Sequence, residues 1–186
     1  MKFFSKNEII GIVVILLAIS LASFSNFKVS LRRARDVQRK NDIRLVTDSL
    51  VRYSGDFGSF PLAEEGKIVA CKGPETKIDA KGIIRNLVTC EWGKAALADV
   101  FDSTYSPYVT TLPLDPQAPE GDYLYLSSGE RFQLYAALEG SDEAEYDEKI
   151  VGRGLLCGKR TCNFGLSYSA PLDKSIEEYE NELLGK

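Results

Sequence analysis

Few residues of this chain have types and spacings that could do chemistry. It has 186 residues and no histidine, so the commonest general base and metal ligand is missing. Four cysteines stand out, and Glu8 is an isolated carboxylate at the start of an otherwise uncharged apolar run. No nucleophile–base pair, ligand cluster of suitable spacing or cofactor fingerprint is recognisable. We therefore expect that the protein is not an enzyme and uses no cofactor.

The four cysteines are Cys71, Cys90, Cys157 and Cys162. Their even number favours disulfides in a chain that carries an export-type apolar segment. A zinc site built from all four is the alternative, but neither sequence-local pair has the two-residue spacer of a zinc knuckle. Of the three possible pairings we favour the sequence-local one, which joins Cys71 to Cys90 and Cys157 to Cys162.

An acidic segment at residues 141–148 contains five carboxylates within eight residues. Carboxylate oxygens are the ligands that Ca²⁺ prefers, so a calcium site is one interpretation. The segment lacks the central glycine and terminal glutamate of an EF-hand loop. A solvated run of charges is the preferred interpretation, and calcium is the alternative cofactor.

These residues must be positioned by an unusually long element near the N-terminus. We expect one helix over residues 4–54, roughly 75 Å long at about 1.5 Å per residue. Residues 4–27 would be its membrane-spanning or filament-core part, because the run from Ile9 to Phe24 is uncharged and rich in Ile, Leu and Val. A cleavable secretory signal peptide, cut after Ser20 or Ala22, is the alternative for this run.

The second part of the helix, residues 28–54, is amphipathic. Four apolar residues recur at three- and four-residue steps and predict a buried stripe: Ile43, Val46, Leu50 and Tyr53. Gly55 is the expected C-cap, and Pro61 prevents the helix from resuming. Everything from residue 55 to residue 186 is expected to form one globular head.

The head should contain a small antiparallel sheet. Residues 123–127 and 131–139 alternate as the two strands of a hairpin, with one sheet face on the helix and tyrosines exposed on the other. Short helical patterns occur at residues 81–88 and 93–101, and residues 173–184 predict a polar C-terminal helix. Trp92, next to Cys90, is expected in the core beside a disulfide. The fold class is therefore α+β.

Charge limits the partners and complicates the orientation. The net charge is −4, so nucleic acid is not indicated as a partner. Five basic residues crowd the helix after its apolar run, namely Arg32, Arg33, Arg35, Arg39 and Lys40. The positive-inside rule would place this end in the cytoplasm, whereas disulfides require the opposite side. A basic segment next to a membrane also contacts lipid headgroups or neighbouring acidic surfaces.

Several of these segments resemble one family. Residues 4–10, Phe-Ser-Lys-Asn-Glu-Ile-Ile, resemble the start of mature type IV pilins and type II secretion pseudopilins, which begin with Phe and carry Glu four residues later. Residues 33–43 and 53–61 resemble the charged helix and the glycine-rich turn that follow in bacterial pilins and major pseudopilins. Residues 111–116 resemble the family's Leu-Pro-x-Asp-Pro turn, and residues 123–139 its closing hairpin. Residues 162–167 are similar to a C-terminal motif of some pilins.

The resemblance implies a pilin-like fold, in which a long helix packs on a head with a small antiparallel sheet. It also implies that the chain is a filament subunit, stored in the cytoplasmic membrane with its head outside. Residues 1–3 would be a short leader removed by a prepilin peptidase between Phe3 and Phe4, although that enzyme usually cuts after Gly. Phe4 and Glu8 would act in assembly. Its partners would be other copies of itself, membrane lipid and the inner-membrane assembly machinery. A single-pass, membrane-anchored extracellular binding module that does not polymerise is the alternative.

Overall fold

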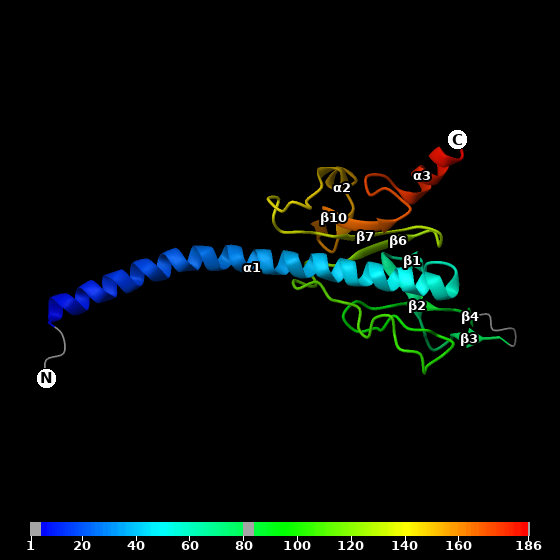
Figure 1. The fold of residues 1–186 in the computed structure, drawn as a ribbon, viewed down its shortest axis with the longest axis horizontal. Helices are drawn as coiled ribbons and strands as arrows, with labels where there is room; N and C mark the ends of the chain where they lie inside the picture. The colour runs from blue at the N-terminus through cyan, green and yellow to red at the C-terminus, as the bar shows by residue number, and fades with distance from the viewer. Residues whose placement is uncertain (1–4, 80–83, 186) are drawn as a thin grey trace.

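The computed structural model describes residues 5–79 and 84–185. The fold is α+β: a helix of 52 residues, α1 (Lys6–Phe57), is followed by small antiparallel sheets. Figure 1 shows that the head packs along only the C-terminal half of α1, while its N-terminal half extends away as a single rod. This arrangement confirms the fold class expected from the sequence.

Both ends of α1 are set by local chemistry. Ser5 is the N-cap, and it forms a capping box with Glu8. The C-cap is Gly58 with φ 76°, a left-handed conformation that glycine adopts without a Cβ clash. The expected stop at Gly55 is wrong. The helix continues to Phe57 because the Phe57 ring stacks on Tyr53 with centroids 4.3 Å apart, which anchors the last turn.

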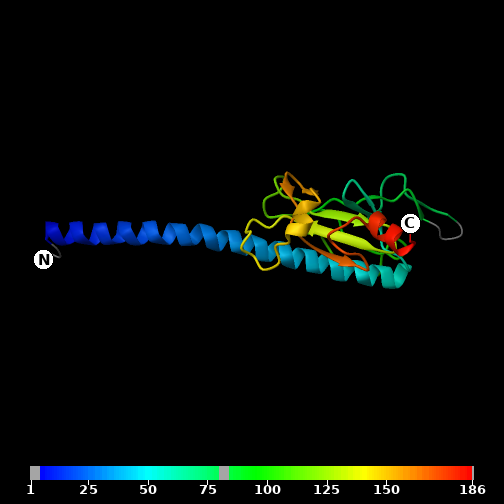
Figure 2. The same cartoon turned by 90° about the horizontal axis from the view of Figure 1, so that it is seen from above.

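The larger sheet packs on α1 and has the order β10–β7–β6. Its strands are β6 (Leu124–Ser127), β7 (Phe132–Ala136) and β10 (Phe164–Tyr168), all antiparallel. The expected stripe of α1, Ile43, Val46, Leu50 and Tyr53, is buried in the same core cluster as Tyr125 and Leu134. Figure 2 shows the sheet lying beside the C-terminal half of the helix.

The expectation that the sheet exposes its tyrosines is wrong. Tyr125 is fully buried on the α1 side, where its hydroxyl donates to the Pro61 carbonyl oxygen at 2.8 Å. Tyr135, on the opposite face, is also fully buried and belongs to a second core cluster with Ile150. Both faces are therefore covered, because the chain after β7 folds back over the outer one.

A second sheet has the order β1–β2–β5 and joins β1 (Leu62–Glu64), β2 (Lys67–Cys71) and β5 (Val88–Thr89). Strands β3 (Lys77–Ile78) and β4 (Ile84–Arg85) form a separate pair. The helices predicted at residues 81–88 and 93–101 are wrong: the first range holds strand residues, with 80–83 outside the described residues, and the second consists of turns and an isolated bridge. Both apolar patterns are too short to distinguish helix from strand.

The C-terminal part covers the outer face of the larger sheet. It contains α2 (Glu148–Gly152), the short strands β8 (Leu156–Cys157) and β9 (Arg160–Thr161), and α3 (Ile176–Leu183). The helix predicted in the tail is thus present as α3, which begins with a capping box of Ser175 and Glu178.

Two disulfides join the pairs that the sequence favours. Cys71 bonds to Cys90, 19 residues apart in sequence, and Cys157 bonds to Cys162, 5 apart. Trp92 is buried in the same core cluster as Cys90, as expected. The first bond joins β2 to the segment after β5. The second closes the β8–β9 turn, which packs against the outer face of the larger sheet.

Candidate functional site

The N-terminal half of α1 is an apolar surface with no cover from its own chain. Large apolar side chains from residue 9 to residue 31 are all exposed, with Leu21 at 73% and Ile10 at 62%. Among the described residues, α1 is the one helix that is both long enough and apolar enough to cross a membrane. An exposed apolar surface of this size requires lipid or another apolar partner, because it would otherwise face water.

Glu8 has a local partner that the sequence-based interpretation missed. Its Oε2 accepts a hydrogen bond from the Ser5 backbone N–H at 2.6 Å, and the Ser5 Oγ accepts one from the Glu8 N–H at 3.4 Å. The spacing Ser-x-x-Glu before an apolar run could have revealed this capping box. Phe3 and Phe4, expected at the processing site and in assembly, lie outside the described residues.

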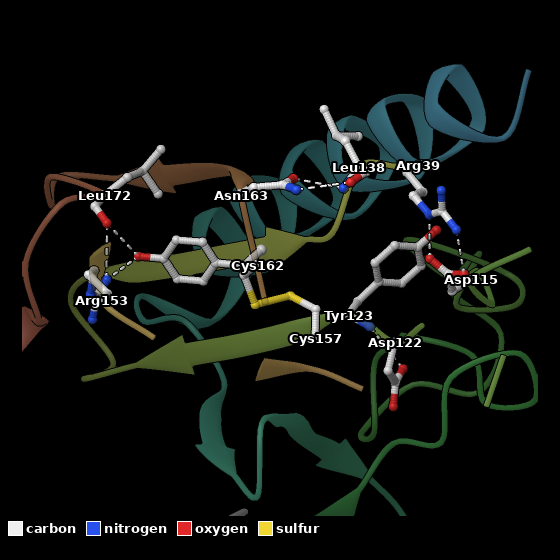
Figure 3. Close-up of a disulfide and its surroundings, with 11 residues drawn as sticks. Arg39, Asp115, Asp122, Tyr123, Leu138, Arg153, Cys157, Cys162, Asn163 and Leu172 are labelled. Carbon is white, nitrogen blue, oxygen red and sulfur yellow. Dashed lines mark hydrogen bonds and ion pairs between the residues drawn. A yellow bond between two sulfur atoms is a disulfide. The ribbon is translucent and has the colours of Figure 1, made fainter. Parts of the chain in front are cut away.

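A buried ion cluster, which we call the clamp, fixes α1 to the head at the point where the rod emerges. Its centre is Arg39, which is fully buried and donates to both Asp115 oxygens at 2.7 and 3.0 Å. Arg39 also donates to Asp36 and to Glu139, each at 2.8 Å. Figure 3 shows Arg39 reaching from α1 to Asp115 in the loop below. One guanidinium thus joins the helix to two separate loops of the head.

The carboxylates of the clamp are held from both sides. Asp36 is fully buried and accepts the backbone N–H groups of Glu139 and Gly140 at 2.8 and 3.0 Å. Glu139 accepts two hydrogen bonds from Arg35, both at 2.6 Å. These bonds from Arg35, joined by that from Arg39, outweigh the effect of burial and lower the pKa of Glu139 to about 2. Arg35 and Arg39 therefore favour the ionised form of Glu139 despite its burial.

The acidic segment pairs with the basic helix instead of facing only water. Lys40 donates to Glu143 at 2.8 Å and to Glu145 at 3.0 Å, and Arg32 contacts Asp142 at 2.6 Å. The interpretation as a merely solvated charge run is therefore wrong for these carboxylates. The hydrogen bond that Lys40 donates to Glu143 raises the pKa of Lys40, and burial lowers it by less. Across the described residues, no three His, Cys, Asp or Glu side chains are grouped as a metal site.

The pairing also bears on the charge of the rod where it leaves the head. Arg32, Arg35, Arg39 and Lys40 are each paired with carboxylates of the head or the helix. Arg33 is 3.8 Å from Asp142, and its side chain is 63% exposed. The folded head therefore neutralises most of the basic segment that the positive-inside rule counts as cytoplasmic.

The second disulfide is buried in the core cluster on the outer face of the sheet, and hydrogen-bonded side chains lie nearby. Next to Cys162, Asn163 accepts from the Leu138 N–H at 2.7 Å and donates to the Leu138 carbonyl oxygen at 2.9 Å. Arg153 donates to the Tyr135 hydroxyl and to the Leu172 carbonyl oxygen (Figure 3). The two bonds of Asn163 hold Leu138, which follows β7 and precedes Glu139 of the clamp.

Comparison of the chain with protein-family models, with curated proteins and with solved structures finds no match. Function must therefore be inferred from the residues themselves. The structure does not bring Glu8 and the cysteines together: Glu8 begins the rod, while both disulfides brace the head. What it adds is the clamp, which sequence reasoning did not identify as a unit.

Proposed function

We propose that this protein is the subunit of a type IV pilus-like or pseudopilus-like filament, stored in the membrane and polymerised through α1. The observation that carries the proposal is the uncovered apolar half of α1, continuous with a second half that the head holds rigidly. The resemblance of residues 4–10 and 33–61 to pilins supports it. In this role the protein is a structural subunit and not an enzyme.

The physics of such a helix suits polymerisation. An apolar rod can leave the bilayer only if its surface is reburied at once, and the nearest apolar surface outside lipid is another rod of the same kind. Extraction and assembly are then a single event. The clamp contributes by fixing the direction of the rod relative to the head, so that every copy presents its head to its neighbours in the same orientation.

Glu8 is the residue that controls register in this proposal. A carboxylate in an apolar bundle is costly unless it is paired. We assign its partner as the amine of Phe4 on a neighbouring copy, freed when a prepilin peptidase removes residues 1–3. The capping bond to Ser5 satisfies Glu8 within its own chain until that neighbour docks.

A shearing experiment tests this role. Cells that express the wild-type chain, Glu8→Ala or Glu8→Gln are sheared, and both the released material and the membrane fraction are blotted. We expect Glu8→Ala to stay in the membrane with little or no release, and Glu8→Gln to be intermediate. Sequencing the released wild-type chain should find Phe4 first. Normal release of Glu8→Ala would contradict the assembly role of this carboxylate.

A further inference from the structure

The far end of the head carries a polar, aromatic depression that neither the rod nor the clamp uses. It has a volume of about 600 Å³, within the range of roughly 300–1,000 Å³ typical of ligand pockets. It lies between the last turns of α1 and the loop that follows Phe101. We call it the Tyr105 cleft, and six of its lining residues matter: Arg52, Asp56, Thr104, Tyr105, Ser106 and Tyr108.

Two opposite charges in the cleft are fixed by one buried residue. Tyr108 is 5% exposed, and its hydroxyl donates to Asp56 Oδ2 at 2.6 Å. Its backbone carbonyl oxygen accepts from Arg52 Nη2 at 2.6 Å. Burial, followed by the hydrogen bond to Asp56, raises the pKa of Tyr108, so its hydroxyl remains a donor at neutral pH. The charged pair is therefore preorganised, which lowers the cost of ligand binding.

Both charged groups keep free hydrogen-bonding capacity. In the described part of the chain, Asp56 Oδ1 and the Nε and Nη1 groups of Arg52 have no partner within the protein. Next to them the Tyr105 side chain is 49% exposed, and its ring lies 5.8 Å from that of Tyr108. The cleft thus offers strong donors, a strong acceptor and an aromatic surface, with no net charge.

From these features we infer that the Tyr105 cleft binds a neutral oligosaccharide. Each sugar hydroxyl both donates and accepts, so neighbouring hydroxyls can bond to Asp56 and Arg52 at once. The apolar C–H face of a pyranose packs against an exposed tyrosine ring. Because Arg52 and Asp56 carry opposite charges, the cleft has no net charge with which to favour an anionic or a cationic sugar over a neutral one. The cleft belongs to a single chain, so this binding does not require polymerisation.

The test uses the full chain in phosphatidylcholine nanodiscs, which avoids detergents with sugar headgroups. Saturation-transfer NMR is recorded with maltotriose, triacetylchitotriose and N-acetyllactosamine as probes, and with 3′-sialyllactose and a proline-rich decapeptide as competitors of different chemistry. We expect at least one neutral sugar to bind, with affinity on the order of millimolar for so open a site. Tyr105→Ala should weaken that binding by up to about tenfold, because it removes the stacking surface.

Tyr168→Ala is the matched control, because Tyr168 is similarly exposed at 45% but lies on β10, away from the cleft. It should bind sugar as the wild type does. Should Tyr105→Ala fail to fold, hydrogen exchange on the wild type decides instead: bound sugar should protect residues 104–108 and leave 164–168 unchanged. No binding of any neutral sugar, equal binding by Tyr105→Ala, or preference for sialyllactose or the peptide would each overturn the proposal.

Discussion

Removal of the Arg39 side chain should destabilise the head more than any other single change in the basic segment. Arg39→Met keeps the apolar volume of the side chain but deletes the cation that faces Asp36, Asp115 and Glu139. Asp36 and Asp115 would then be buried charges without that partner, and breaking a buried pair in this way costs about 3–5 kcal/mol. At about 2–4 °C per kcal/mol, the melting temperature should fall by roughly 6–20 °C.

The assay is thermal unfolding of the full chain in nanodiscs, followed by near-ultraviolet circular dichroism of the aromatic core. Arg33→Met is the matched control: it is on the same helix, but its side chain is 63% exposed. Exposed ion pairs contribute only about 0–1 kcal/mol, so this variant should unfold close to the wild type.

A double variant separates the charge effect from lost packing. Arg39→Met combined with Asp115→Asn removes one of the stranded carboxylates together with its cation. It should recover part of the lost stability, because contacting charges couple by about 0.5–3 kcal/mol. If Arg39→Met melted within about 2 °C of the Arg33→Met control, or if the double variant were additive, the clamp would not be the junction that the geometry implies.

Three further predictions can be checked on the same preparation. Non-reducing peptide mapping should find both disulfides, and four free thiols or bound zinc would contradict this. Reduction should destabilise the head by about 3 kcal/mol for the bond with 19-residue separation and by about 2 kcal/mol for the bond with 5-residue separation. Glu139, whose folded pKa of about 2 is below its ordinary 4.5, contributes stability above pH 4.5 that is lost as pH falls toward 2. We expect the free energy of unfolding to fall by at most about 3 kcal/mol. Burial raises the pKa values of Asp42 and Asp122, so protonation of these two groups partly offsets the loss. The Glu139→Gln variant should not show the loss. Lys40→Met should free the acidic segment, so residues 141–147 should exchange amide hydrogens faster, while an unchanged exchange rate would show that Lys40 does not order this loop.

The sequence was sufficient to predict the elements whose signals are local and repeated. An unbroken apolar run followed by the stripe of Ile43, Val46, Leu50 and Tyr53 predicts α1, since helical periodicity over many turns has few alternatives. The alternation of residues on either side of the turn at Ser128 and Gly129 predicts the β6–β7 hairpin, because a two-residue period is typical of strands. Cysteine number and spacing were enough to favour the disulfide pairing observed.

What sequence reasoning missed depends on contacts between distant segments. Phe57 in the last turn of α1 stacks not only on Tyr53 but also on Phe101, more than forty residues later, with centroids 6.0 Å apart, and local sequence cannot show this second contact. Tyr135 is buried because the chain after β7 returns over it, which strand alternation alone cannot show. The clamp joins residues 76 to 104 positions apart, so no local pattern identifies Arg39 as its centre. The sequence shows a basic run at residues 32–40 and an acidic run at residues 141–148, but it does not show that the two runs pair with each other.

Electron microscopy of filaments sheared from cells that express this chain, with mass spectrometry of the same material, tests the central proposal most directly. We predict helical filaments composed of this chain, with α1 rods bundled along the axis and heads on the outside. The Tyr105→Ala variant should form the same filaments, because its cleft is not part of the rod. A chain found only in the membrane fraction, with no filament that contains it, would contradict the proposal and favour a membrane-anchored binding module.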